Sequence, residues 1–438
     1  RFETQNGIND HGDWAPRIGF AWGVGGKKDT PPKTVIRTGF GMFYDRFAQS
    51  LIMQAERFNG INQQQFIIDG NAANQAFLNN AFALYPALPP PTSATSATTV
   101  DTIDPSLRTP YTIQFAGSVE RQLTKTATLT GTYVHSHGVH QLFSTVLNPG
   151  ALAPQYQFES GGVFNQNQFI VNFNVRAGTR LTIFSFYMFG HANSDTAGAT
   201  SFASNPTKGI AADYGRAAFD VRHRVFLGGT WALPHGFRVS PFMVFNSGTP
   251  FSIITGTDLN GDSIFNDRPA FATDLSRPSV VQTSFGAFDT SPIPGQTIIP
   301  SNFGPGPSQF TLNLRLGKTI GIGPKLEAAN PAPQQGQQGQ HGPSGGRQGG
   351  AGREPGGGGP VMAGGRRGGP FGGPERSNQR YSLTFSANAR NIFNKVNPGL
   401  PIGNLSSGLF GQSTALAGGV FNTQSANRRI DLQVMFSF

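Results

Sequence analysis

The sequence predicts an all-β fold, a transmembrane antiparallel β-barrel, on the strength of three observations. Segments of roughly ten residues that alternate between apolar and polar side chains recur along the chain. The connections between these segments alternate between short and long, as they do where strands cross a membrane and return. The chain also ends on a strand-like segment, 429–438, whose alternate residues are apolar up to the terminal Phe438.

Composition supports a strand-based membrane protein and excludes several other classes. Only 13% of the 438 residues are charged, about half the usual share in soluble domains. No run approaches the roughly 18 apolar residues of a membrane helix, so insertion would have to use strands. The lack of cysteine excludes disulfides and thiolate metal sites. Enzyme signatures such as G-x-S-x-G, H-E-x-x-H and the P-loop are absent, so we expect no catalysis and no required cofactor.

We expect about eleven strands. In chain order they cover 14–24, 34–47, 111–123, 126–138, 168–177, 179–190, 219–233, 237–253, 309–320, 381–393 and 429–438. The alternation is clear at 111–123, where Tyr111, Ile113, Phe115 and Val119 share one side of the predicted strand. Pro241 weakens the strand predicted at 237–253, because proline cannot donate to a ladder.

The connections predict which way the barrel faces. The short ones lie near 25–33, 123–125, 177–179 and 234–236, and the long ones at 48–109, 137–167, 191–218, 255–307 and 395–427. If the C-terminus is periplasmic, all these long connections are extracellular loops. The exception is 322–379, a long insert in a predicted periplasmic turn. Its glycine-rich part, 331–376, is expected to be disordered.

Charged residues within the strands provide a separate test. Six of them occupy the parity opposite to the apolar face: Arg37, Glu120, Arg176, Arg315, Arg390 and Asp431. A charge at the lipid midplane costs roughly 2–4 kcal/mol, so this placement is what a lipid-facing surface would enforce. Arg121 departs from the pattern, but it adjoins a short turn from which its side chain could reach the lipid head groups.

The C-terminal segment is expected to close the barrel and to act as the signal for the barrel assembly machinery. Its apolar side, which we expect to contact outer-membrane lipid, comprises Ile430, Leu432, Val434, Phe436 and Phe438. The chain begins at Arg1 without a signal peptide. We therefore expect a fragment that lacks an N-terminal part, leaving the strand at 14–24 without its neighbour.

The chain resembles the C-terminal part of TonB-dependent outer-membrane transporters, in particular their Oar-like branch. The resemblance runs from Trp14 to Phe438 and rests on the phrases WAPRIGFAW, VIRTGFGMFYDRF, PYTIQFAGSVERQL, YVHSHGVHQL, FDVRHRVFLGGTWALP, NSGTPFSIITGTDLNGDSIFNDRPA and ANARNIFNKVNPG. It implies that residues 1–438 form the C-terminal half of a 22-stranded barrel in the outer membrane of a Gram-negative bacterium. It also implies an upstream plug, Ton box and carboxypeptidase-regulatory-like domain, and ligand uptake driven by a TonB-type complex.

Two other functions remain open from the sequence. The first is a structural, adhesion or protein-export barrel, which the absence of an upstream plug and Ton box would favour. The second is a soluble nucleic-acid binder of the RGG type, because arginines flanked by glycine occur in 331–376. Beyond Phe371, this segment lacks interleaved aromatic residues on which bases could stack, so we expect no nucleic-acid partner. The extracellular ligand cannot be read from these residues.

The best candidate site is the segment DLNGDSIFND at 258–267. Its oxygen-bearing side chains lie on a short loop bent by glycine, as in many Ca²⁺ sites, and are Asp258, Asn260, Asp262, Asn266 and Asp267. The segment resembles the first half of an EF-hand loop but lacks the bidentate glutamate. The alternative is a plain turn stabilised by local hydrogen bonds of its Asp and Asn side chains. Any Ca²⁺ here would be structural.

Two further groups are weaker candidates. His135, His137 and His140 form H-x-H-x-x-H at a strand end, where 135 and 137 share a face and could hold a transition metal. The alternative is an ordinary strand-to-loop junction. Asp45 and Arg46 lie at an extracellular strand end, where they could contact a substrate or simply form a salt bridge at the rim.

Overall fold

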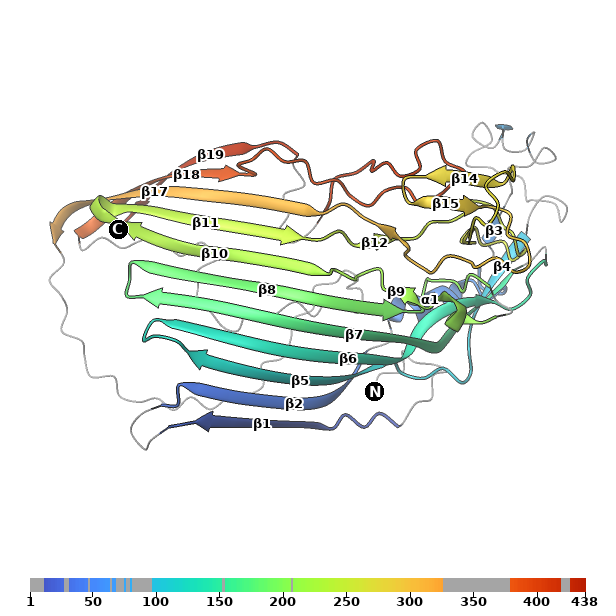
Figure 1. Cartoon of the computed structure of the whole chain (residues 1–438), viewed down its shortest axis with the longest axis horizontal. Coiled ribbons are helices and arrows are strands. Elements are labelled where there is room, and N and C mark those ends of the chain that lie inside the picture. The colour runs from blue at the N-terminus through green and yellow to red at the C-terminus, as the bar shows by residue number, and fades with distance from the viewer. Residues whose placement is uncertain are drawn as a thin grey trace.

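One large antiparallel sheet dominates the computed structural model, which describes residues 12–26, 31–45, 48–63, 65–67, 75, 79–80, 97–151, 154–205, 208–325, 379–418 and 426–438 (Figure 1). Eleven strands follow one another along the sheet, and the sequence predicted each of them. They are β1 (Arg17–Val24), β2 (Thr34–Tyr44), β5 (Tyr111–Gln122), β6 (Ala127–Val146), β7 (Gln155–Ala177), β8 (Leu181–Ser194), β10 (His223–Leu233), β11 (Phe237–Asn246), β17 (Gln309–Lys325), β18 (Gln379–Arg390) and β19 (Arg429–Ser437).

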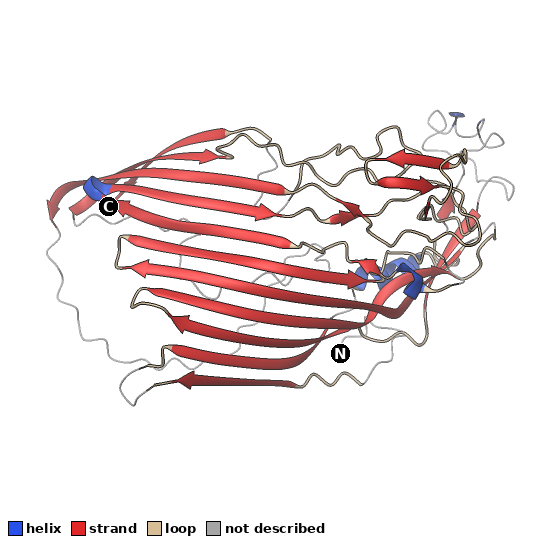
Figure 2. Cartoon of the chain, viewed as in Figure 1, coloured by secondary structure: helices blue, strands red, loops and turns tan. Residues whose placement is uncertain are grey.

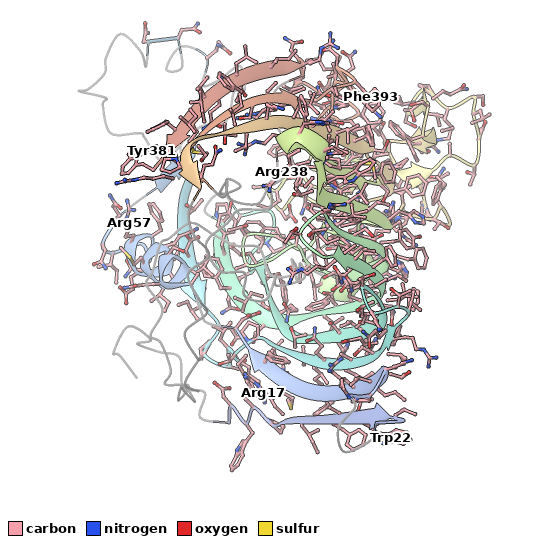
Figure 3. All side chains as sticks on the ribbon, turned by 90° about the vertical axis from the view of Figure 1, so that its left-hand side faces the viewer. Arg17, Trp22, Arg57, Arg238, Tyr381 and Phe393 are labelled. Carbon is pink, nitrogen blue, oxygen red and sulfur yellow. The ribbon has the colours of Figure 1, made fainter. Side chains whose placement is uncertain are left out.

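The sheet curves, and its two faces differ in composition. Figure 3 shows Trp22 on the outer side of the curve and Arg238 on the inner side. The outer face carries a band of exposed apolar side chains that includes Ile18, Phe20, Phe115, Phe169, Trp231, Leu316, Phe385 and Leu432. On the inner face, Phe226 is only 2% exposed and packs with Phe184, Phe186 and Phe242. In the described residues β1 and β19 are the two edges, so the sheet is not closed into a barrel.

Charged side chains follow the predicted face. On the inner face Arg37 pairs with Glu120 at 2.8 Å, and Arg390 pairs with Asp431 at 3.2 Å. Arg121 is on the outer face beside a short turn, where its Nη1 donates to Thr34 Oγ1 at 2.8 Å. The outward Lys318 donates to the carbonyl of His235, which lies in the turn between β10 and β11. Outward cations are thus drawn toward the turn end of the sheet, as expected for side chains leaving a lipid layer.

Connections of different length gather at opposite ends of the sheet (Figure 2). At the turn end, β7 and β8 are joined by three residues, and η2 (Pro234–Gly236) joins β10 to β11. The predicted insert at 322–379 lies mainly outside the described residues. Its first four positions, 322–325, complete β17, and residue 379 begins β18, so the predicted boundaries were too wide. No described helix is long and apolar enough to cross a membrane.

The β6–β7 hairpin extends well beyond its neighbours at the other end, the loop end. The sequence predicted a loop at 137–167, but β6 continues to Val146 and β7 begins at Gln155. The pairing shifts between Gly138 and Leu142, and the intervening His140 has φ of +54°. At about 3.4 Å per residue, the 23 residues of β7 reach roughly 75 Å, whereas a membrane strand needs only about 9–11 residues.

Shorter elements lie at the loop end of the sheet. They are α1 (Gln49–Arg57), β3 (Gln65–Ile67), β4 (Ala97–Ile103), η1 (Ile210–Asp213), β9 (Gly215–Arg216), β12 (Pro250–Phe251), β13 (Ala270–Phe271), β14 (Val280–Thr283), β15 (Gly286–Asp289) and β16 (Gly304–Pro305). Strand β4 pairs in parallel with β7, and Leu51 of α1 packs near Phe158. A separate apolar core forms within the loops from Phe251, Ile253, Phe288 and Ile299.

Candidate functional site

A cavity of about 420 Å³, here called the loop-end pocket, opens on the inner face at the loop end. Its walls come from α1, from the β6–β7 hairpin, from the end of β8 and from the segment before β10. The apolar side chains in these walls include Leu51, Leu142, Phe164 and Phe219, and the polar ones are Asp45, Gln141, Ser194 and Thr196. An apolar cavity with a few polar groups is the usual form of a small-molecule site.

Among the described residues, Asp45 is the one ionisable side chain in the lining. It follows β2 directly, and its backbone nitrogen donates to the carbonyl of Pro110 at 2.9 Å, which fixes the strand end. Burial raises the pKa of the Asp45 carboxyl above its ordinary value, because the charged form is poorly solvated there. The sequence singled out Asp45 together with Arg46, but Arg46 lies outside the described residues.

The other polar groups of the pocket are held in place by the backbone. Thr196 Oγ1 donates to the carbonyl of Leu142 at 2.9 Å, and Ser194 Oγ donates to that of Val163 at 3.0 Å. Gln141 Nε2 donates to Val139 at 3.2 Å. With its hydroxyls engaged in this way, the pocket is suited to holding a ligand that has an apolar part and a hydrogen-bond donor or cation for Asp45.

A smaller cavity of about 140 Å³, here called the acidic cavity, adjoins this pocket and shares Ser194 and Thr196 with it. Asp195 lies in its wall, and burial raises the pKa of Asp195 to about 6. The backbone N–H of Val163, which donates to Asp195 at 2.7 Å, opposes this rise only in part. Asp195 therefore changes charge close to neutral pH.

A buried ion pair crosses the acidic cavity. Arg268 Nη2 lies 2.5 Å from Asp213 Oδ1, with both side chains less than a tenth exposed. Arg268 also donates to Ser301 Oγ at 2.9 Å and to the carbonyl of Ala212 at 3.1 Å. Burial lowers the pKa of Arg268 from its ordinary value, and the carboxylate of Asp213 acts against that change. Arg268 thus links its own loop to the loops that contain Asp213 and Ser301.

Sequence reasoning missed Asp195, Asp213 and Arg268. It also missed Asp220, which is 1% exposed and accepts from Arg216 and Arg222, each at 2.9 Å. For Asp220 the sequence did offer a signal, because in FDVRHR this aspartate lies between two apolar residues and close to arginines. A buried carboxylate needs a nearby cation, so the pattern indicates a buried ion pair. The signal does not identify partners as distant in sequence as Asp213 and Arg268.

The predicted calcium segment forms a compact loop, 258–267. Asp258 accepts backbone N–H bonds from Gly261 at 2.7 Å and Ser263 at 2.8 Å, and Asp262 Oδ1 accepts from Ile264 at 2.8 Å. Asp267 Oδ2 accepts from Leu259 at 2.7 Å. The side-chain amides point outward from the loop, with Asn260 Nδ2 donating to Ser204 and Asn266 Nδ2 to Phe202. These contacts agree with the turn-forming role considered for the segment.

The three histidines do not come together as a metal site. His135 and His137 share the outer face, as their spacing predicted, and their Nδ1 atoms lie 2.9 Å from Asn167 Oδ1 and 2.7 Å from Asn165 Oδ1. His140 occupies the irregular part of β6 and packs edge-on against Tyr111. Within the described part of the chain, no three His, Cys, Asp or Glu side chains are grouped to hold a metal.

The C-terminal strand has the predicted outward side. Its alternate residues are all exposed, and they are Ile430, Leu432, Val434, Phe436 and Phe438. The other side carries Asp431, which contacts Arg390 and Arg429. Strand β19 pairs with β18 along its whole length, from Arg390 opposite Arg429 to Ser382 opposite Ser437. It is thus built as a lipid-facing strand, and among the described strands it pairs with β18 alone.

A comparison with family models identifies this architecture. The model described as "Outer membrane beta barrel domain" matches residues 3–328. The chain belongs to this family. In outer-membrane β-barrels the long loops generally face the outside of the cell and the short turns the periplasm. By that rule we expect the loop-end pocket and the acidic cavity to be extracellular.

Several solved structures resemble this outer-membrane protein. The outer membrane transporter YddB from Escherichia coli is 12% identical, with a TM-score of 0.49, and the match covers 96% of this chain and 40% of that one. The FrpB iron transporter from Neisseria meningitidis is 9% identical, with a TM-score of 0.42 and 96% and 38% coverage. The ferric enterobactin receptor PfeA from Pseudomonas aeruginosa is 8% identical, with a TM-score of 0.41, and the match covers 97% of this chain and 39% of that one. This chain thus spans about two fifths of their length. No curated protein matched the chain.

Proposed function

We propose that the protein is an uptake receptor of the outer membrane, which binds an extracellular ligand and imports it through a gated barrel. The loop-end pocket carries this proposal, because a partly apolar cavity at the loop end of the inner face is the kind of place where a small molecule would bind. The phrases shared with TonB-dependent transporters agree with it. Energy would come from a TonB-type complex in the periplasm, and no covalent chemistry is assigned to this chain.

The pocket also limits the class of ligand. Its apolar walls favour a molecule with an aromatic or aliphatic part, and Asp45 favours a donor or cation on it. A volume of about 420 Å³ is at the small end of the range for drug-sized ligands. We therefore propose a small organic molecule, or the exposed part of a larger one.

An adhesion or protein-export barrel is the second candidate. The observation that favours it is the β6–β7 hairpin, which extends far beyond the length of a membrane strand and offers surface to a macromolecule. This candidate predicts that changes in the β6–β7 hairpin alter adhesion or protein export, whereas changes in the loop-end pocket do not.

The two candidates can be separated without knowing the ligand. Strains with and without the gene are grown in the same medium, and the compounds removed from that medium are compared by mass spectrometry. Uptake predicts at least one compound that only the carrying strain removes, and whose removal stops when an uncoupler collapses the proton gradient. If no compound differs while surface adhesion or the secreted proteins change, the uptake proposal is wrong.

A pocket variant assigns that uptake to the site. Ala218 is exposed and lines the loop-end pocket, so Ala218→Trp fills the cavity without disturbing buried residues. We expect it to reduce uptake by at least about tenfold, equivalent to about 1.4 kcal/mol of lost binding. Ala415→Trp is the matched control, because Ala415 is an exposed alanine in another loop. Equal uptake by the two variants would place the binding site elsewhere.

A further inference from the structure

The extracellular loop 258–267 contains a buried carboxylate oxygen without a partner. Asp262 is 1% exposed. Its Oδ1 accepts the N–H of Ile264, whereas its Oδ2 is buried and has no hydrogen-bond partner. Asn266 Oδ1 is buried and unpartnered in the same way. Buried polar atoms in native proteins are nearly always satisfied, so each exception needs an explanation, and a bound ion is one of the explanations.

The charge around Asp262 is also unbalanced. Asp258 and Asp267 belong to the same loop, and none of the ion pairs among the described residues involves any of these three carboxylates. The adjacent Arg268 is engaged with Asp213. No residue of the loop itself supplies a positive charge, and Arg268 divides its charge between Asp267 and Asp213.

We propose that this loop binds one Ca²⁺ through the side chains of Asp258, Asn260 and Asp262, with Asp262 Oδ2 as the buried ligand. Ca²⁺ accepts six to eight oxygen ligands from carboxylates, amides, backbone carbonyls and water. The loop offers the first three kinds, and water completes the shell. Ions that need three carboxylate, histidine or thiolate ligands do not fit, because the described residues contain no such group.

Ca²⁺ at this position stabilises the contacts between extracellular loops. Asn260 Nδ2 donates to the carbonyl of Ser204 at 2.9 Å, and Gly150 at the tip of the β6–β7 hairpin donates to Gly261 at 2.5 Å. Ser204 and Arg268 line the acidic cavity. An ion that fixes 258–267 thus also fixes one wall of that cavity and the hairpin tip. This role does not depend on the uptake function proposed above.

The test uses the full chain in detergent, first stripped with EGTA and then titrated with CaCl₂ in a calorimeter. Extracellular calcium modules typically bind with Kd of about 10⁻⁴–10⁻³ M, so we expect one site in that range or tighter. Terbium luminescence gives a second readout. Tyr156 packs against Phe202, with ring centroids 4.9 Å apart, and the Phe202 carbonyl accepts from Asn266 of the loop, so this phenol lies close enough to act as a sensitiser.

Three substitutions decide the assignment. Asp262→Asn keeps the shape of the side chain and removes its charge, so we expect Ca²⁺ affinity to fall by about tenfold or more. Asp258→Asn, at a half-buried position, should weaken binding similarly even if Asp262→Asn folds poorly. Asp274→Asn is the control, because Asp274 is an exposed loop carboxylate that binds Ser276. A stripped protein that binds no Ca²⁺, or three variants with equal affinity, would overturn the proposal.

Discussion

The outer and inner faces of the sheet are formed by the same strands, yet they pack in different ways. Leu432 on the outer face is 82% exposed, whereas Phe226 on the inner face is 2% exposed and surrounded by other rings. An apolar side chain is stabilised outside by lipid and inside by specific neighbours. The stability of the outer face therefore depends only on its side chains being apolar. The stability of the inner face depends on which side chains pack against one another.

The largest effect should come from removing an inner-face ring. Phe226 lies 5.0 Å from Phe242 and 5.5 Å from Phe186 between ring centroids. Phe226→Ala leaves a cavity among these rings and should lower the free energy of unfolding by about 3–5 kcal/mol. Urea-induced unfolding in lipid vesicles measures the loss. The control is Phe115→Ala on the outer face, where lipid can fill the space, and equal losses would refute the contrast between the faces.

A charge on the outer face should have the next largest effect. Leu432→Arg places a cation in the apolar band of β19, at a cost of about 2–4 kcal/mol near the bilayer midplane. Gln433→Arg, one residue further along, places the same charge on the inner face and should be tolerated. Insertion into vesicles, scored by heat-modifiable migration in gels, compares the two. Similar insertion yields would show that β19 does not face lipid.

The smallest effect concerns pH at the extracellular end of the inner face. The pKa of Asp195 is raised from 3.8 to about 6, so the folded loop binds the proton more tightly than the unfolded chain does. The resulting stability is fully present below about 3.8 and is lost as pH rises through about 6. Hydrogen exchange near Val163, corrected for the intrinsic rate, should show less protection at pH 7 than at pH 4. Asp195→Asn should remove this dependence; if it persists in the variant, another group is responsible.

The sequence predicted the spanning part of the fold because lipid imposes a local rule. A strand with lipid on one side must alternate, so Tyr111, Ile113 and Phe115 reveal their strand without reference to its neighbours. The same rule placed Arg37 and Asp431 on the inner face. The alternation rule also predicted β11 correctly, although Pro241 lies within this strand, opposite Leu314. Eleven strands followed from residues only two positions apart in sequence.

The loop end could not be predicted in this way. Helix α1 forms within a segment expected to be a plain connection, and its Leu51 is buried near Phe158, more than a hundred residues away. The loop-end pocket combines Asp45 with Thr196, and the ion pair combines Asp213 with Arg268. No periodicity links such positions. The sequence could nominate Asp45 and the loop 258–267 by residue type, but their neighbours depend on how the long loops pack.

The β6–β7 hairpin has a consequence for the energetics of binding. Several loops are fastened to it, since Ser144 bonds Ser201 and Ala203, Tyr156 packs against Phe202, and β4 pairs with β7. Loops held in this way have already given up their conformational entropy on folding. A ligand entering between them meets preorganised walls, and less of its interaction energy is offset by ordering the receptor. The length of β6 and β7 thereby contributes to ligand affinity, even where neither strand contacts the ligand.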